Sequence, residues 1–192
     1  MLTQDISPYK GETTKASAMN KLELAKRIKE VAFLEGYFTL RSGKKSKYYV
    51  DKYLFGTQPD ILKRLAVELA KILPPADSFD RLAGPELGAV TITSVLACEI
   101  NKPFVLVRKD AKGYGTDKIF EGALNKGERV VLIEDILTTA GAALSAAERL
   151  RDYGVEIVKI IGVVDREEGA AENIANAGFQ MDALFRKTDL GI

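Results

Sequence analysis

From residue 81 onward, short continuous apolar runs alternate with segments of helical periodicity. Continuous runs, in place of alternating apolar and polar residues, are typical of strands whose two faces are both covered. Such strands belong to a parallel sheet, because each crossover between them carries a helix. The sequence therefore predicts an α/β fold with an open, mainly parallel sheet flanked by helices. The expected strands are 81–83, 104–107, 130–133, 157–164 and 181–185, with helices that end at Ile100 or span 142–153 and 167–177.

The first 80 residues follow a different pattern, in which helical periodicity comes before two β-prone runs around a polar turn. We expect a helix over 20–35 ended by Gly36, a hairpin of 38–40 with 48–50, and a second helix over 59–73. Residues 1–18 are polar and read as an arm. We therefore expect an arm over 1–18 and a single domain over 19–192, with an N-terminal helix-plus-hairpin unit over 19–57 and a core over 58–192.

Composition excludes several classes of protein. The chain has 192 residues, the length of one ordinary domain, and no apolar stretch approaches the roughly 20 residues that span a bilayer. A net charge of +1 is low for a nucleic-acid-binding protein. The absence of histidine removes Ser-His-Asp and Cys-His mechanisms and most structural zinc sites. The one cysteine, Cys98, lies in an apolar run and reads as a packed thiol. We expect a reduced, cytoplasmic protein with neither membrane nor nucleic acid as a partner.

The most informative segment begins at the apolar run 130–133. Two carboxylates, Glu134 and Asp135, end the run, and a turn of small and hydroxyl residues leads into a helix. Ligands of open α/β sheets bind at the carboxyl ends of the strands, and a turn before a helix can offer amides to a phosphate. The carboxylates can accept hydrogen bonds from sugar hydroxyls or face a hydrated Mg²⁺. Helix capping by Thr138 or Thr139 is the simpler alternative, but it does not explain the two acids.

This segment resembles the phosphoribosyl-diphosphate (PRPP) motif of the type I phosphoribosyltransferases. The resemblance implies that the two acids contact the ribose hydroxyls and that the turn binds the 5-phosphate. Ala140 departs from the glycine that the family usually has there. The residues implied to bind PRPP are Glu134, Asp135, Ile136, Leu137, Thr138, Thr139, Ala140, Gly141 and Ala142, with Asp135 also implied in catalysis.

A second group of residues is basic and follows the expected strand 104–107. Arg108, Lys109 and Lys112 lie within five residues, and the same stretch contains two glycines. Such a cluster is usually a solvated surface, although loops also gather binding residues. The spacing is similar to the catalytic loop of orotate phosphoribosyltransferases. That similarity implies that the three cations act in catalysis and bind PRPP with Tyr114, where many members have histidine. It also implies a homodimer in which the loop 108–116 reaches the partner's site.

A third group is the basic and aromatic hairpin. A nucleic-acid patch is conceivable there, but the hairpin is short and the chain nearly neutral. Residues 36–51 resemble the N-terminal hood of orotate phosphoribosyltransferases, and we call residues 19–57 the hood. The resemblance implies that Arg41 contacts substrate and that the backbone near Tyr49 and Val50 meets the orotate ring.

The fourth group combines a glycine-rich turn with an arginine. The turn 84–88 follows an expected strand and offers amides to a pyrophosphate, although a plain strand-to-helix connection explains it equally well. Arg166 follows another strand and resembles the arginine that binds the orotate carboxylate, with Thr138 also facing orotate. A planar guanidinium suits a carboxylate, whereas the alternative for Arg166 is an ion pair with Glu167 or Glu168. The implied pyrophosphate loop is Pro85, Glu86, Leu87 and Gly88, and some members have lysine at Leu87.

Taken together, the resemblance implies an orotate phosphoribosyltransferase of the type I fold. Its substrates would be orotate and PRPP, with Mg²⁺ carried on the pyrophosphate and no direct protein ligand to the metal. One alternative is a phosphoribosyltransferase for a purine or a free pyrimidine, which would not need Arg166. Another is a regulator that senses PRPP, which would not need the basic loop. A fused decarboxylase, as in bifunctional relatives, would need a longer chain.

Overall fold

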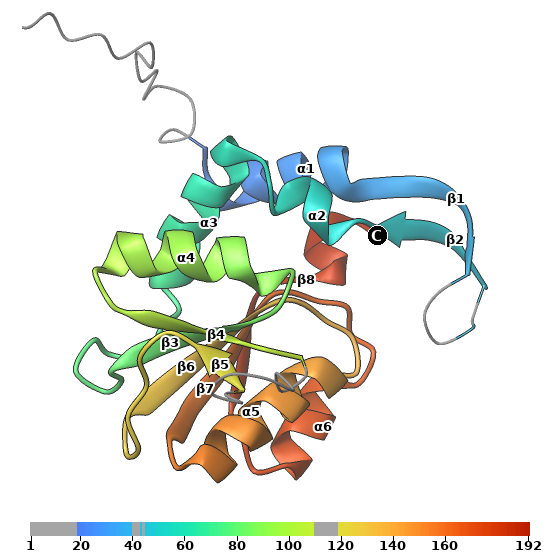
Figure 1. Cartoon of the computed structure of the whole chain (residues 1–192). Helices are drawn as coiled ribbons and strands as arrows, with labels where there is room; N and C mark the ends of the chain where they lie inside the picture. The colour runs from blue at the N-terminus through green and yellow to red at the C-terminus, as the bar shows by residue number, and fades with distance from the viewer. Residues whose placement is uncertain (1–18, 40–42, 44, 110–118) are drawn as a thin grey trace, which may run out of the picture.

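The computed structural model describes residues 19–39, 43, 45–109 and 119–192. Its centre is a six-stranded sheet with the strand order β5-β4-β3-β6-β7-β8, in which only the edge pair β4–β5 is antiparallel (Figure 1). This confirms the predicted α/β class and the mainly parallel sheet. The strands are β3 (Arg81–Pro85), β4 (Phe104–Val107), β5 (Phe120–Glu121), β6 (Arg129–Leu137), β7 (Glu156–Asp165) and β8 (Met181–Arg186).

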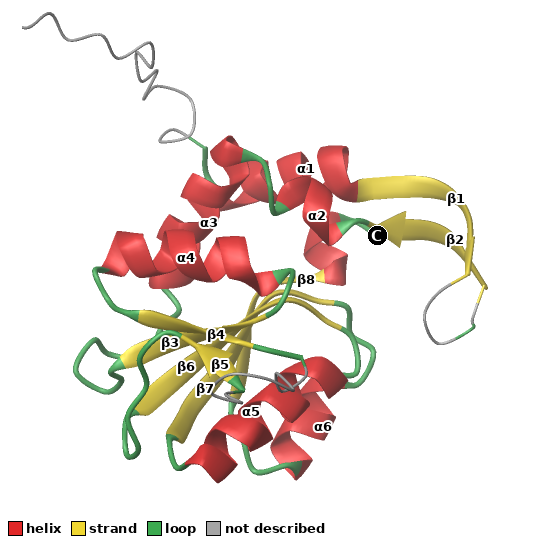
Figure 2. Cartoon of the chain, viewed as in Figure 1, coloured by secondary structure: helices red, strands yellow, loops and turns green. Residues whose placement is uncertain are grey.

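Helices cover both faces of this sheet. Helix α4 (Ala89–Ile100) lies on one face, and α5 (Gly141–Tyr153) and α6 (Ala170–Asn176) lie on the other (Figure 2). The middle strand β6 is therefore buried on both sides, which is why Val130 to Ile133 are all apolar and inaccessible to solvent. The turns after β3, β6 and β7 all leave the sheet at its carboxyl edge, where ligands of such sheets bind.

The N-terminal unit lies at that edge and includes a projecting hairpin (Figure 1). Strands β1 (Phe33–Thr39) and β2 (Lys45–Val50) pair in a separate antiparallel sheet, which confirms the predicted hairpin. Helix α1 (Lys21–Ala32) packs on α2 (Lys52–Phe55), α3 (Pro59–Ala70) and the C-terminal 3-10 helix η1 (Lys187–Leu190). The expected arm over 1–18 lies outside the described residues, and the division between hood and core at residues 57 and 58 stays a prediction.

Three expected helix boundaries are wrong. The first helix ends at Ala32 because Phe33 already pairs with Val50, and Gly36 lies within β1 where the register shifts. The helix expected over 59–73 ends at Ala70, four residues before Pro74 and Pro75. The helix expected over 167–177 starts only at Ala170, because Glu167 and Gly169 both have positive φ.

The prediction that Cys98 is a packed thiol is also wrong, because its side chain is exposed. Helix α4 turns Ile92, Leu96 and Ala97 toward the core. Successive helical residues are about 100° apart, so Cys98 and Glu99 turn away from that face. The apolar run around Cys98 predicts a helix but does not show which of its residues face the core.

Within the described residues, no helix is long and apolar enough to cross a lipid bilayer.

The amino ends of the two central strands, β3 and β6, are joined by ion pairs. Arg129 binds Asp80 through Nη2 at 2.8 Å and through its backbone N–H, and Arg81 binds Glu128 through two bonds of 2.9 Å. Hydrogen bonds from these arginines lower the pKa of Asp80 and that of Glu128 to about 2 each.

We predict that these two carboxylates contribute to the acid limb of the stability curve. A carboxyl group whose pKa is lowered by folding stabilises the native state above its unfolded pKa, and this contribution is lost as pH falls toward the folded pKa. The double variant Asp80→Asn/Glu128→Gln should melt below wild type at pH 6, and the difference should shrink between about pH 4.5 and about pH 2. Thermal melts across this range measure the effect. The exposed pair Glu99→Gln/Asp152→Asn is the control, and melting curves displaced equally at every pH would contradict the prediction.

Candidate active site

Two adjacent carboxylates lie buried at the carboxyl end of the central strand β6. The exposed fractions of Glu134 and Asp135 are 6% and 1%. Burial first, and the neighbouring charge of Asp135 second, raise the pKa of Glu134 well above its ordinary value. Glu134 Oε2 is buried and has no hydrogen-bond partner among the described residues. The strand thus presents two carboxyl groups whose hydrogen-bonding capacity is only partly used.

Lys52, at the start of α2, pairs with Asp135 and was not singled out by the sequence. Its Nζ lies 2.9 Å from Asp135 Oδ2 and 3.3 Å from Oδ1, and the Ile136 N–H donates to Oδ1 at 2.6 Å. Burial opposes the charge of Lys52, but the attraction of Asp135 outweighs it and raises the pKa of the ammonium. The two residues are 83 positions apart in the chain, and no motif spacing connects them.

The turn after β6 leads directly into the N-terminus of α5. The residue that caps α5 is Ala140, and no side chain accepts a hydrogen bond from the first turn. The alternative that Thr138 or Thr139 caps the helix is therefore wrong. Thr139, Gly141 and Ala142 are exposed, whereas Leu137 is buried in the core. An open N-terminus of a 13-residue helix favours an anion.

Ala140 adopts the left-handed conformation, with φ of 62°. A side chain is disfavoured there, which gives a physical reason for the glycine that the family usually has. The residue is only 4% exposed and packs in the apolar cluster beneath α5. The extra methyl group therefore lies against the core.

The glycine-rich turn between β3 and α4 directly contacts the acid pair. A Cβ placed on Gly88 would lie 1.5 Å from Asp135 Oδ2 and 3.0 Å from Lys52 Nζ. Only glycine permits this approach. Leu87 is 67% exposed, and Glu86 Oε1 accepts a hydrogen bond of 2.7 Å from the Lys109 backbone N–H. The turn therefore borders the acid pair, and it also holds the start of the basic stretch at Lys109.

The described part of the basic stretch is anchored on both sides. Arg108 Nη1 lies 3.5 Å from Glu121, and the Lys109 carbonyl accepts a hydrogen bond of 2.8 Å from Arg149. Lys112 and Tyr114 lie outside the described residues, and so does Arg41 of the hairpin.

Arg166 lies between the end of β7 and the hairpin. Its guanidinium carbon is 5.8 Å from the centre of the Tyr48 ring, and its Nη2 pairs with Glu168 at 2.9 Å. The ion pair considered as the alternative is therefore present. The side chain is nevertheless only 12% exposed, and Nε is buried without a hydrogen-bond partner among the described residues. The Arg166 backbone N–H donates to the Leu137 carbonyl, which places this arginine beside the turn after β6.

The hairpin residues differ in what they offer the site. Tyr49 is 38% exposed and packs beside Phe38, with ring centres 5.6 Å apart. Val50 is buried in the main apolar cluster, so its side chain has a packing role. Tyr48, which was not among the predicted site residues, is the hairpin side chain that contacts Arg166. Its aromatic ring and the basic residue lie 118 positions apart, so this contact was not visible in the sequence.

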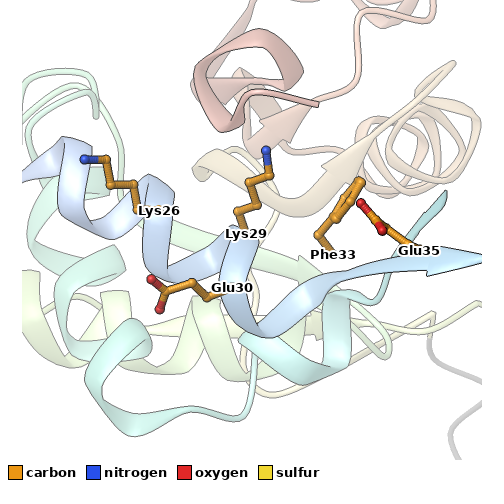
Figure 3. A pocket seen from close by; sticks show the side chains of 5 residues that line it. All are labelled: Lys26, Lys29, Glu30, Phe33 and Glu35. Atoms are coloured by element: carbon orange, nitrogen blue, oxygen red, sulfur yellow. The ribbon is translucent and has the colours of Figure 1, made fainter.

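A separate hollow of about 440 Å³ lies on α1 and the start of β1 (Figure 3). Its lining mixes two lysines and two glutamates with Phe33, and Lys29 already donates to the Gly191 carbonyl at 2.6 Å. None of its lining residues comes from the carboxyl ends of the strands. Among the described residues, the groups suited to bind a substrate are therefore Lys52, the acid pair, the two turns and Arg166.

Comparisons with known proteins show which family this chain resembles. The model of the phosphoribosyl transferase domain matches residues 57–180. The orotate phosphoribosyltransferase of Methanocella arvoryzae is 42% identical over 88% of this chain and 95% of its own length. That of Thermococcus kodakarensis is 49% identical over 84% and 87%, respectively.

A solved structure extends the comparison to the fold. The Mycobacterium tuberculosis orotate phosphoribosyltransferase in complex with PRPP is 29% identical, with a TM-score of 0.72 over 90% of this chain and 99% of that one. The chain belongs to the orotate phosphoribosyltransferase family, whose core is the phosphoribosyl transferase domain.

Proposed function

We propose that this protein transfers ribose 5-phosphate from PRPP to orotate, with orotidine 5′-monophosphate and pyrophosphate as products. One observation carries the proposal: two buried carboxylates lie close to the carboxyl end of β6, and this strand leads into a turn whose helix N-terminus no side chain caps. Carboxylates suit a pair of sugar hydroxyls, and an open helix N-terminus suits a phosphate. A ribose 5-phosphate group presents both, a short distance apart.

The ribose half of the substrate is held by the turn and the acid pair. Asp135 accepts hydrogen bonds from the ribose hydroxyls, and Glu134 supports it or contacts them through water. The segment 138–142 holds the 5-phosphate with backbone amides and the Thr138 and Thr139 hydroxyls. This geometry fixes the ribose before the reaction and so lowers its entropic cost.

The chemical step is a displacement at the first carbon of the ribose. A ring nitrogen of orotate forms the new bond to this carbon, and the bond from the carbon to the pyrophosphate oxygen breaks. The transition state places positive charge on the ribose and negative charge on the leaving group. Arg108, Lys109 and Lys112 stabilise the departing pyrophosphate beside the turn 85–88.

Orotate is held between the end of β7 and the hairpin. Arg166 is nearly buried, and Tyr48 lies over its guanidinium. In that setting Arg166 offers two parallel hydrogen bonds to the orotate carboxylate, in exchange for its contact with Glu168. Arg41, the backbone at Tyr49 and Val50, and Thr138 complete the base site in this proposal.

Mg²⁺ fits this site as part of the substrate complex. Among the described residues, no group of three or more histidine, cysteine, aspartate or glutamate side chains is arranged to hold a metal ion. The unpartnered Oε2 of Glu134 offers an oxygen to the hydration shell of such an ion. Mg²⁺ bound to pyrophosphate supplies charge neutralisation of the leaving group.

We further propose that the enzyme works in the cytoplasm.

The direct test of the function is an assay of base consumption with PRPP and Mg²⁺. Orotate should be consumed, and adenine, hypoxanthine and uracil should not, because these bases carry no carboxylate for Arg166. Each base is measured in parallel, with release of pyrophosphate as a second readout. Consumption of one of the other bases in preference to orotate would refute the proposal.

We predict that Arg166→Ala raises the KM for orotate by roughly 30-fold or more and changes the KM for PRPP little. Truncating one partner of a buried charged pair costs about 2–5 kcal/mol. Arg166→Lys should recover part of the loss, because it keeps the charge without the paired geometry. Arg151→Ala, on the exposed face of α5, is the matched control. Equal changes in both KM values would contradict the assigned role.

We also propose a homodimer in which the segment 108–116 of each chain serves the partner's site. Chains carrying Lys112→Ala or Asp135→Asn should each be nearly inactive alone and should regain activity when unfolded and refolded together. Random mixing makes half of the dimers mixed, and each mixed dimer has one intact site. The expected recovery is about a quarter of wild-type activity by twofold statistics. No recovery, with mixed dimers confirmed by mass, would show that the segment serves its own chain.

A further inference from the structure

The acid pair creates a charge problem for the proposed substrate. PRPP is a polyanion, and it has to approach two carboxylates that are almost completely buried. Like charges that come into contact repel one another more strongly in a buried site than in water, because the dielectric constant there is lower. Lys52 is the cation that contacts Asp135, and it reaches the pair from the hood and not from the sheet.

The position of Lys52 gives it a second possible partner. A Cβ on Gly88 would lie 3.0 Å from Lys52 Nζ, so the ammonium rests against the turn proposed to hold the pyrophosphate. This turn carries no basic side chain of its own, since residues 84–88 read Gly-Pro-Glu-Leu-Gly. The Lys52 side chain is 33% exposed, whereas that of Asp135 is 1% exposed. The ammonium therefore contacts Asp135 and lies 5.6 Å from the centre of the Tyr53 ring, while the side chain that carries it keeps access to solvent.

We propose that Lys52 is a diphosphate-binding residue, which Asp135 holds in place while the site is empty. When the ribose hydroxyls occupy the Asp135 carboxylate, the ammonium transfers its contact from Asp135 to the diphosphate. This exchange offsets the charge of Asp135 before substrate arrives and supplies a cation to the otherwise acidic turn afterward. The inference deepens the proposed function and rests on it.

The alternative is that Lys52 only fastens the hood to the core. Other contacts already do this. The Thr91 hydroxyl of α4 donates to the Gly56 carbonyl at 2.8 Å, directly after α2, and within the hood Asp51 caps α2 by accepting from the Tyr53 N–H at 3.0 Å. Phe55 of the same short helix is fully buried. The backbone around Lys52 is therefore fixed without the ion pair, and a neutral replacement should fold.

The test measures ligand binding by calorimetry on the full chain, with pyrophosphate plus Mg²⁺ and with ribose 5-phosphate as separate probes. Lys52→Met should weaken pyrophosphate binding by about tenfold or more, because it removes a charged hydrogen bond. Binding of ribose 5-phosphate should change by less than about threefold, because it uses the turn 138–142. Lys52→Arg should retain most of the pyrophosphate affinity. Lys63→Met, an exposed lysine of α3, is the control.

A rescue experiment distinguishes a direct contact from a structural effect. In the Lys52→Met background, Leu87→Lys places a cation on the exposed position of the glycine turn and should restore several-fold of the lost pyrophosphate affinity. Steady-state kinetics should show the same pattern, with the KM for PRPP raised in Lys52→Met and that for orotate nearly unchanged. Unchanged pyrophosphate binding in Lys52→Met, or an equal loss for both probes in Lys52→Met and Lys52→Arg, would overturn the proposal.

The two proposals fail separately. If wild-type protein does not consume orotate, the proposed function fails, while the calorimetry still measures whether Lys52 binds pyrophosphate. If wild type consumes orotate and Lys52→Met binds pyrophosphate normally, only the role of Lys52 fails.

Discussion

The contact between Lys52 and Asp135 is the interaction on which the site depends. A carboxylate that is 1% exposed is costly unless a cation and hydrogen-bond donors compensate it. The sheet supplies the Ile136 N–H, and the cation comes from α2. The absence of a side chain at Gly88 leaves room for both charged groups. The acid pair, the hood and the glycine turn therefore meet at one contact, although they come from three separate parts of the chain.

The N-terminal unit contacts both halves of the proposed substrate site. Lys52 reaches the acid pair that would hold the ribose, and Tyr48 lies over Arg166, which would hold the base. A two-stranded hairpin is marginally stable alone, and here Phe33 stacks on Tyr48 at 5.4 Å to support it. In the proposed function, recognition of the base and charge compensation at the ribose site thus depend on the same docked element.

The sequence predicted the sheet, the hairpin and the acid pair because each has a local signal. Continuous apolar runs mark buried strands, and two acids at the end of such a run are unusual enough to indicate a site. Lys52 and Tyr48 have no such signal, because their partners lie 83 and 118 positions away. The error at Cys98 has a similar origin, since an apolar run does not show which residues a helix turns to the core. The predicted helix ends were wrong where strand pairing or a positive φ sets the end of the helix, as at Phe33 and Glu167.

The lack of histidine makes physical sense for this chemistry. The proposed reaction needs fixed charges more than a proton shuttle, and Lys and Arg stay charged across the neutral range. Burial and Asp135 raise the pKa of Glu134. The ammonium of Lys52, 2.9 Å from Asp135, offsets part of the negative charge of the pair. A polyanionic substrate therefore meets less repulsion than two uncompensated carboxylates would cause, and the buried Asp135 carboxylate remains available to accept hydrogen bonds from the ribose in the proposed reaction.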